Sequence, residues 1–173
     1  SCRNTFSLIS YLENSTGTDI APLLKSVGVA QSIEHLKDPH KWLSYVDSLK
    51  LFELTRRLQP TRNPRRFKDI GRHAHRWQSM GAGVDALANL LTLRHVMWIA
   101  SEYGRVFNNG QFIRSIRKKP GELVLASKYA EYVNPVKTID MDWWSMGIYT
   151  GFPERRGLPA ADLVVDYSLF SVE

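Results

Sequence analysis

The stretch that decides the fold is Asp140-Met-Asp-Trp-Trp-Ser-Met-Gly-Ile-Tyr-Thr-Gly-Phe-Pro-Glu-Arg-Arg-Gly-Leu-Pro-Ala-Ala-Asp-Leu-Val-Val-Asp-Tyr-Ser-Leu-Phe, residues 140–170. Apolar residues recur at helical spacing over its first half, which predicts a short amphipathic helix over 142–156. Asp140 or Asp142 is the expected N-cap, since a short acidic side chain can accept a hydrogen bond from one of the free backbone N–H groups in the first turn. Gly157 is expected to end the helix, because glycine readily adopts the left-handed conformation that closes one.

Three segments of the C-terminal half predict β-strands. Residues 163–170 open with a β-branched run that is typical of a buried strand. Residues 106–117 and 123–132 flank a turn that contains proline and glycine, and they predict an antiparallel hairpin. Upstream, the sequence predicts helices over 4–14, 20–27, 38–58, 63–78 and 84–103. This order predicts an α+β fold, in which the N-terminal helical half packs on a small antiparallel sheet formed as strand, strand, helix, strand.

The predicted helices differ in how clearly they begin and which face they bury. Asp38-Pro39 indicates the start of the helix over 38–58, since proline favours the first helical position. Helix 84–103 is apolar over most of its circumference, which predicts a central element. The expected buried residues of helix 4–14 are Phe6, Leu8, Ile9 and Leu12. Those of helix 38–58 are Trp42, Val46, Leu49 and Phe52, with Leu51 and Leu58 as further candidates. Those of helix 63–78 are Phe67, Ile70, Ala74 and Trp77.

Length, charge and cysteine content limit the classes of protein that need to be considered. The 173 residues are expected to form a single domain over 1–173, because a chain of this length can bury a core. A net charge of +6 is compatible with an acidic partner. The single cysteine, Cys2, cannot build a disulfide framework or a cysteine-based metal site. No membrane-length apolar run or signal-peptide pattern is present, so a cytoplasmic domain with no membrane partner is expected.

The tail Gly147-Ile-Tyr-Thr-Gly-Phe-Pro-Glu-Arg-Arg-Gly-Leu-Pro-Ala-Ala-Asp-Leu resembles the closing part of small-molecule sensor domains of the 4-vinyl reductase type. The opening Arg3-Asn4 and the segment Leu36-Lys-Asp-Pro-His-Lys-Trp also fit this resemblance. Such domains are similar in fold to heme nitric-oxide-binding domains and to the TRAPP subunits of Golgi transport. They stand at the N-terminus of bacterial histidine kinases, nucleotide cyclases and enhancer-binding regulators. The resemblance therefore implies a dimeric bacterial regulatory domain that is part of a longer signalling protein.

The sequence departs from this family at two sets of positions. Tyr167 stands where many such domains have the first of their closing cysteines, so no zinc site is expected. In the heme branch, a Tyr-x-Ser-x-Arg motif precedes a Gly-Leu pair. Here Gly151, Pro153 and Arg155 fall on that motif, so only the arginine matches. His95 is the candidate axial ligand if heme binds, but with this motif largely missing no cofactor is expected.

Other groups of polar residues have a structural explanation beside a functional one. His73 and His75 are two residues apart and would point away from each other on a helix, which does not suit a metal site. A basic cluster could contact nucleic acid or an acidic partner, or could be a solvated face. Its members are Arg56, Arg57, Arg62, Arg65, Arg66, Lys68, Arg72 and Arg76. Because no recognition helix or aromatic platform accompanies the cluster, nucleic acid is not the expected partner.

A ligand pocket is predicted between the helix over 84–103, the sheet and the helix over 142–156. Ligand sites are typically concave and mostly apolar, with a few polar groups that orient the ligand. Its predicted lining residues are His95, Met97, Trp98, Phe112, Trp144 and Tyr149. The alternative is that these residues simply fill a close-packed core.

These features predict a non-catalytic sensory domain that binds a small, largely apolar or aromatic ligand. No pairing of nucleophile and base, phosphate loop or paired carboxylates is present to indicate an enzyme. The signal would pass through a homodimer to a C-terminal or separate effector domain. Helix 4–14 is the first candidate for the dimer interface, and the helix over 38–58 is the second. The alternative function is a protein-interaction or dimerisation module with a filled core and no ligand.

Overall fold

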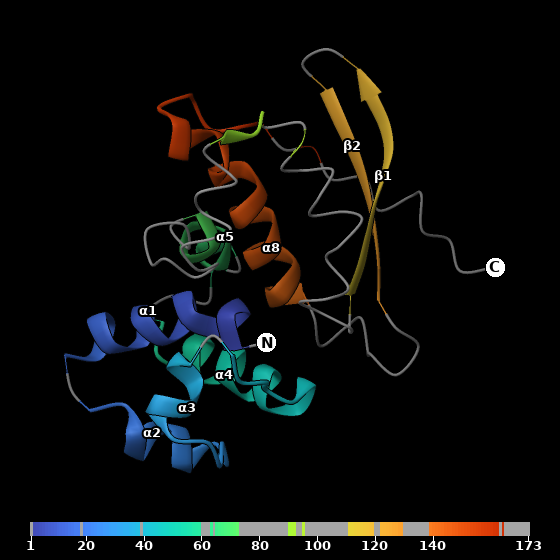
Figure 1. Ribbon diagram of the computed structural model, residues 1–173. Coiled ribbons are helices and arrows are strands. Elements are labelled where there is room, and N and C mark those ends of the chain that lie inside the picture. The colour runs from blue at the N-terminus through green and yellow to red at the C-terminus, as the bar shows by residue number, and fades with distance from the viewer. Residues whose placement is uncertain are drawn as a thin grey trace.

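The helical organisation of the N-terminal half is apparent in the computed structural model (Figure 1). The structure describes residues 2–17, 19–38, 40–59, 63, 65–72, 90–92, 95, 111–119, 122–129, 139–162 and 164. In chain order its elements are η1 (Cys2–Thr5), α1 (Phe6–Thr16), α2 (Ala21–Ser26), α3 (Ile33–Lys37), α4 (Tyr45–Arg57), α5 (Arg65–Arg72), β1 (Gln111–Lys119), β2 (Glu122–Tyr129), α8 (Ile139–Gly151) and η5 (Pro153–Arg156).

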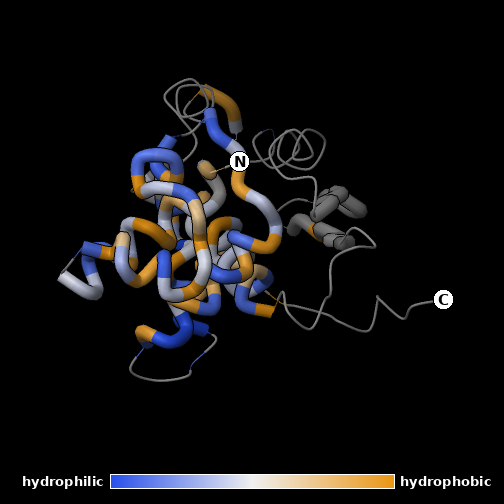
Figure 2. Tube along the Cα trace, turned by 90° about the horizontal axis from the view of Figure 1, so that it is seen from below, coloured by the Kyte–Doolittle hydropathy of each residue, from blue (hydrophilic) through white to orange (hydrophobic). Residues whose placement is uncertain are grey.

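Helices α1 to α4 share one hydrophobic cluster, which we call the first core. Leu12 of α1 and Leu51 of α4 are fully buried in it. Its buried members are Ile9, Leu12, Ile20, Leu24, Val29, Leu36, Leu51 and Leu54. Figure 2 shows stretches of hydrophobic and hydrophilic residues following one another along the coiled tube, as expected for helices that have one apolar and one polar face. The predicted burial of Leu8, Ile9 and Leu12 is confirmed.

The predicted start of helix 38–58 is wrong, because a second capping signal lies further along the chain. Helix α4 begins at Tyr45, and the Ser44 hydroxyl accepts the backbone N–H of Asp47 at 3.0 Å. Asp38 instead ends α3, and its carboxylate accepts the backbone N–H of His40 at 2.8 Å. A serine cap satisfies a free N–H at the helix start as well as an aspartate does, so position alone could not choose between them.

The change of boundary also changes which side chains are buried. Trp42 is 56% exposed and Val46 is 59% exposed, whereas both were expected in the buried stripe. Trp42 precedes the helix and therefore does not follow the helical periodicity that placed it on the inner face. Phe52, further along α4, is buried as predicted.

Helix α8 packs against α5, and together with α1 and α4 they form a second core. Its buried members are Leu8, Phe52, Phe67, Ile70 and Trp144. The predicted inward positions of Phe67 and Ile70 are confirmed. The predicted helix 142–156 is divided into α8 and the short helix η5, and Gly157 closes η5 with φ of 69°. Asp140 lies inside the first turn of α8 and is buried, so it is not the N-cap.

Glycines bring the backbones of α5 and α8 into direct contact. A Cβ atom added at Gly147 would overlap the carbonyl oxygen of Lys68, and one added at Gly71 would overlap that of Trp144. A Cβ at Gly151 would lie 2.6 Å from a backbone oxygen of α5. Only residues without a side chain permit this approach, so the three glycines determine how closely the two helices pack.

Strands β1 and β2 form an antiparallel hairpin, in which Gln111 pairs with Tyr129 and Lys119 with Glu122. The register shifts once, between Ser115 and Arg117. Most of the predicted helix 84–103 and of the predicted strand 163–170 lies outside the described residues. Among the helices that the structure describes, none has the length and apolar character needed to cross a membrane.

Candidate functional site on helix α8

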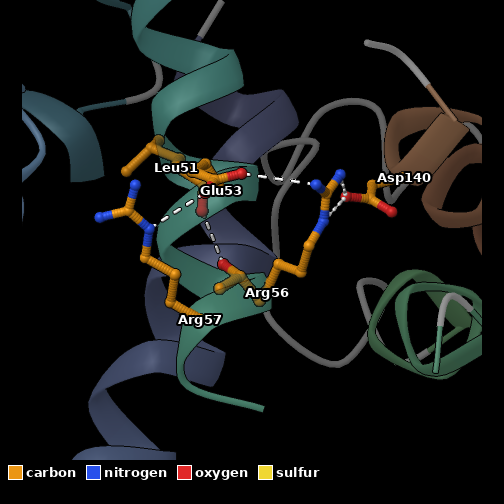
Figure 3. Close-up of polar contacts among 6 residues, drawn as sticks. Leu51, Glu53, Arg56, Arg57 and Asp140 are labelled. Carbon is orange, nitrogen blue, oxygen red and sulfur yellow. Dashed lines mark hydrogen bonds and ion pairs between the residues drawn. The ribbon is translucent and has the colours of Figure 1, made fainter. Parts of the chain in front are cut away.

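An ion pair fastens the N-terminal end of α8 to α4. Arg56 Nε donates to the Asp140 carboxylate at 2.8 Å, and its Nη2 contacts the same oxygen. Figure 3 shows the Arg56 side chain extending from α4 toward Asp140, with Glu53 on its other side. The Arg56 Nη1 atom lies 3.5 Å from the Glu53 carboxylate. The Asp140 side chain is only 5% exposed, so its contact with Arg56 takes the place of contact with water. The pair therefore fixes where α8 begins relative to α4.

A second ion pair fastens the C-terminal side of the same unit. Arg72, the last residue of α5, donates from Nε to the Glu154 carboxylate at 2.8 Å, and its Nη2 contacts the other carboxylate oxygen. This geometry is bidentate, and two parallel contacts restrict the orientation of the Arg72 guanidinium relative to the Glu154 carboxylate more than a single contact does. The hydrogen bonds to Glu154 raise the pKa of the Arg72 guanidinium. Helix α8 and the short helix after it are thus held at both ends.

Trp144 occupies the middle of this packed face. Its indole Nε1 donates to the Ser7 hydroxyl at 2.9 Å, a buried hydrogen bond between α8 and α1. Its ring stands edge-on to Phe52, with centroids 6.0 Å apart, and Phe52 lies 5.4 Å from Phe67. Aromatic pairs in these arrangements are favourable beyond the area they bury. Trp144 is therefore a core residue of the helical half.

Tyr149 lies on the opposite side of α8. It follows Gly147 by two residues, which is roughly 200° around a helix, so it faces away from the contact with α5. Its ring centroid is 6.2 Å from that of Phe152. Burial raises the pKa of the Tyr149 phenol, so this hydroxyl stays protonated and can donate or accept a hydrogen bond. We call this side of α8 the Tyr149 face.

Helix α8 is covered on both sides. From Asp140 to Phe152 every residue is buried or half-buried. A helix with this burial is a central element of its protein, a place that the sequence had suggested for helix 84–103. The sequence offered a signal in the adjacent Trp143 and Trp144 and in Gly147 and Gly151, which are four residues apart and so lie on one face of the helix.

The six predicted pocket residues fall in different places. Trp144 is in the second core and Tyr149 is on the opposite face of α8. His95 is exposed, and its Nδ1 lies 2.7 Å from the Thr92 hydroxyl. Phe112 belongs to β1, whose side chains are not described, and Met97 and Trp98 lie outside the described residues. Among the predicted lining residues whose side chains are described, Trp144 and Tyr149 lie on opposite faces of α8 and His95 is exposed, so the structure does not bring these three together.

The basic cluster proves to be largely a set of contacts within the chain. Arg66 donates to the Tyr11 hydroxyl at 2.9 Å, and its guanidinium lies 5.7 Å from that ring's centroid. Arg57 pairs with Glu53 at 3.0 Å, and Arg56 and Arg72 hold the ends of the α8 unit as described above. Arg62, Arg76, His73 and His75 lie outside the described residues. The sequence offered no sign of the pairings of Arg56, Arg66 and Arg72 with Asp140, Tyr11 and Glu154, because these partners are far away in the chain. Glu53 and Arg57, by contrast, stand at the i,i+4 spacing at which side chains meet on a helix.

The part of the chain that the structure describes contains no group of three or more His, Cys, Asp or Glu side chains placed to hold a metal ion. The carboxylates of Asp140 in α8 and Glu154 in η5 are engaged by arginine, which leaves these two groups poorly placed to act as general bases. The arrangement instead fixes α8 against α4 and α5 and places the Tyr149 phenol on the opposite face of α8. No protein-family model, curated protein or solved structure matches this chain.

Proposed function

We propose that the chain is a non-catalytic sensory domain, in which a small apolar or aromatic ligand binds against the Tyr149 face of α8. The single observation that carries this proposal is the two-sided burial of α8. One side is fastened to α4 and α5, and the other presents a desolvated phenol. A phenol among apolar side chains is the kind of lone polar group that orients a ligand.

The fastening of α8 gives the ligand a route to the N-terminal helices. A ligand changes a conformational equilibrium only if it binds two states differently. A ligand on the Tyr149 face would contact a helix whose backbone touches α5 and whose first turn is paired with Arg56. Any shift of α8 would therefore be transmitted to α4 and α5. We infer that the output is a change in the geometry of a cytoplasmic homodimer that controls an effector domain.

The family resemblance supports the same function. The tail beginning at Gly147 includes both Tyr149 and the Pro153–Arg156 helix, and it is the part that resembles 4-vinyl reductase-type sensors. On this basis we propose an α+β fold, with the helical half packed on an antiparallel sheet that includes the β1–β2 hairpin.

The proposal is tested by thermal unfolding in the presence of indole, p-cresol and 1-naphthol. A ligand present at 100 times its Kd stabilises by about 2.7 kcal/mol, which corresponds to a rise in Tm of roughly 5–10 °C for a domain of this size. Tyr149→Phe should reduce the rise for the ligands that carry a hydroxyl, while Tyr45→Phe on α4 serves as the matched control. If the ligands raise the Tm of Tyr149→Phe and Tyr45→Phe equally, or do not raise the Tm of the unmodified protein, there is no basis for a ligand site at Tyr149.

A second candidate function is an interaction module with a filled core. The observation that favours it is the packing of Trp144, whose indole donates a hydrogen bond to Ser7 and stands edge-on to the ring of Phe52. Close packing of this kind is the default for protein interiors and provides no ligand site. An absence of any thermal response to a broad set of apolar compounds would favour the module over the sensor.

A further inference from the structure

Two large apolar side chains near the start of α4 project into solvent. Trp42 is 56% exposed and Val46 is 59% exposed. They are four residues apart, so their Cα atoms are separated by at most about 14 Å. We define the Trp42 surface as Trp42 and Val46 together with the exposed residues Glu34, His40 and Lys41. His40 and Lys41 directly precede Trp42 in the chain, and Glu34 precedes His35, whose ring contacts the Trp42 carbonyl.

The backbone beneath Trp42 is held on both sides. The Cys2 N–H donates to the Lys41 carbonyl at 3.0 Å, and the His35 ring donates from Nε2 to the Trp42 carbonyl at 3.2 Å. The Lys41 N–H in turn donates to the Asp38 carbonyl at 3.2 Å. A side chain on a fixed backbone loses less conformational entropy when it binds. Tryptophan is also the residue type most often found to dominate binding energy at protein interfaces.

The charge around this surface is balanced, although the chain as a whole is basic. Residues 31–50 contain three lysines and three acidic residues, which gives a formal charge of zero. Residues 51–72 contain seven basic and two acidic residues, which gives +5 of the total +6. Two copies of the chain that met at residues 51–72 would repel each other, because both segments are positively charged. Two copies that met at residues 31–50 would encounter no net charge.

The arrangement of charge at the Trp42 surface suits a second copy better than an oppositely charged partner. A twofold interface places the same surface on both subunits, so that surface must complement itself. Glu34 and Lys41 supply both signs beside the apolar pair. Helix α1 offers no comparable apolar surface, because its residues Leu8 and Leu12 are fully buried within the chain.

We propose that the Trp42 surface is the homodimer interface of this protein, with Trp42 and Val46 at its centre and Glu34 and Lys41 at its rim. The inference rests on the homodimer in the proposed function. Of the two segments that the sequence suggested for it, 4–14 and 38–58, it assigns the interface to the second, which contains Trp42 and Val46. An apolar centre with a charged rim is the usual anatomy of an interface of this kind.

Sedimentation velocity over a range of protein concentrations tests the interface. We expect the unmodified protein to dimerise at micromolar concentrations, and Trp42→Ala to weaken the dimer at least about 30-fold, the effect of losing a binding hot spot. Val46→Asp should also separate the subunits. It should preserve the fold, because an acidic residue is favourable in the first turn of α4. Leu158→Asp is the matched control, since Leu158 is 52% exposed and lies outside the Trp42 surface.

A charge exchange tests whether the surface complements itself. Lys41→Glu alone should weaken the dimer, and the double variant Lys41→Glu with Glu34→Lys should restore it. A monomeric unmodified protein at high micromolar concentration overturns the proposal. The proposal is also overturned if Trp42→Ala leaves the dimer intact, or if Leu158→Asp weakens the dimer as much as Val46→Asp does. A double variant that does not regain the dimer would overturn it as well.

The ligand response distinguishes this proposal from the sensor function. The thermal shift given by the aromatic compounds, measured on Trp42→Ala, should match that of the unmodified protein, since the Tyr149 face is on another helix. A lost dimer with an intact shift supports the interface and the ligand site together. An intact shift with a monomeric unmodified protein refutes the interface alone, and a Trp42-dependent dimer with no shift refutes the sensor alone.

Discussion

At the scale of single residues, the described charges act mainly through defined partners within the chain. Asp47 shows this most fully, since its carboxylate accepts from the Ser44 hydroxyl at 2.7 Å, from Lys50 at 3.0 Å and from Gln31 at 3.1 Å. Burial raises the pKa of Asp47, but these hydrogen bonds outweigh burial and lower it overall. The folded state therefore favours the ionised carboxylate more than the unfolded state does.

This difference predicts a dependence of stability on pH. Because the folded pKa lies below the unfolded one, the contribution of Asp47 is complete above the unfolded pKa and is lost as pH falls through the folded pKa. Asp47→Asn should lower the free energy of unfolding by about 1–2 kcal/mol at neutral pH. Urea unfolding at a series of pH values should show the gap between the two proteins closing as the pH becomes acidic. A gap that stays constant would contradict this account.

At the scale of elements, the crossing of α5 and α8 depends on residues that lack a side chain. Gly147→Ala would normally stabilise a helix interior by about 1 kcal/mol. Here the added methyl group meets the Lys68 carbonyl, so we expect the opposite sign and a loss of about 2 kcal/mol or more. Ser145→Ala on the same helix is the control and should be neutral or slightly stabilising. Chemical denaturation measures both, and a stabilised Gly147→Ala protein would show that the two backbones are further apart.

At the scale of the whole molecule, α1 joins the two cores. Leu12 packs in the first core and Leu8 in the second, and both are fully buried. The two cores should therefore unfold together. Leu12→Ala should lower the free energy of unfolding by about 2–5 kcal/mol. Native-state hydrogen exchange should then show reduced protection in α5 and α8 as well as in α1 to α4, whereas a loss confined to the first core would indicate two independent units.

The local sequence determined much of the helical half. The periodicity of α1 and α5 correctly indicated the buried residues Leu8, Leu12, Phe67 and Ile70, because a helix that covers a core must place its apolar residues on one face. Gly157 correctly indicated a helix end, since φ of 69° is favourable for glycine and strained for other residues. These features depend on near neighbours in the chain, which the sequence contains directly.

Only the tertiary structure decided the contacts that join distant segments. Arg56 and Asp140 lie 84 positions apart, and nothing in either local pattern indicates the other. The exposure of Trp42 depended on which of two capping residues began α4, and the partial burial of Tyr149 depended on which side of α8 met α5. Such choices follow from the packing of whole helices, where the free energy of burial is summed over many residues and outweighs the local preference of any one.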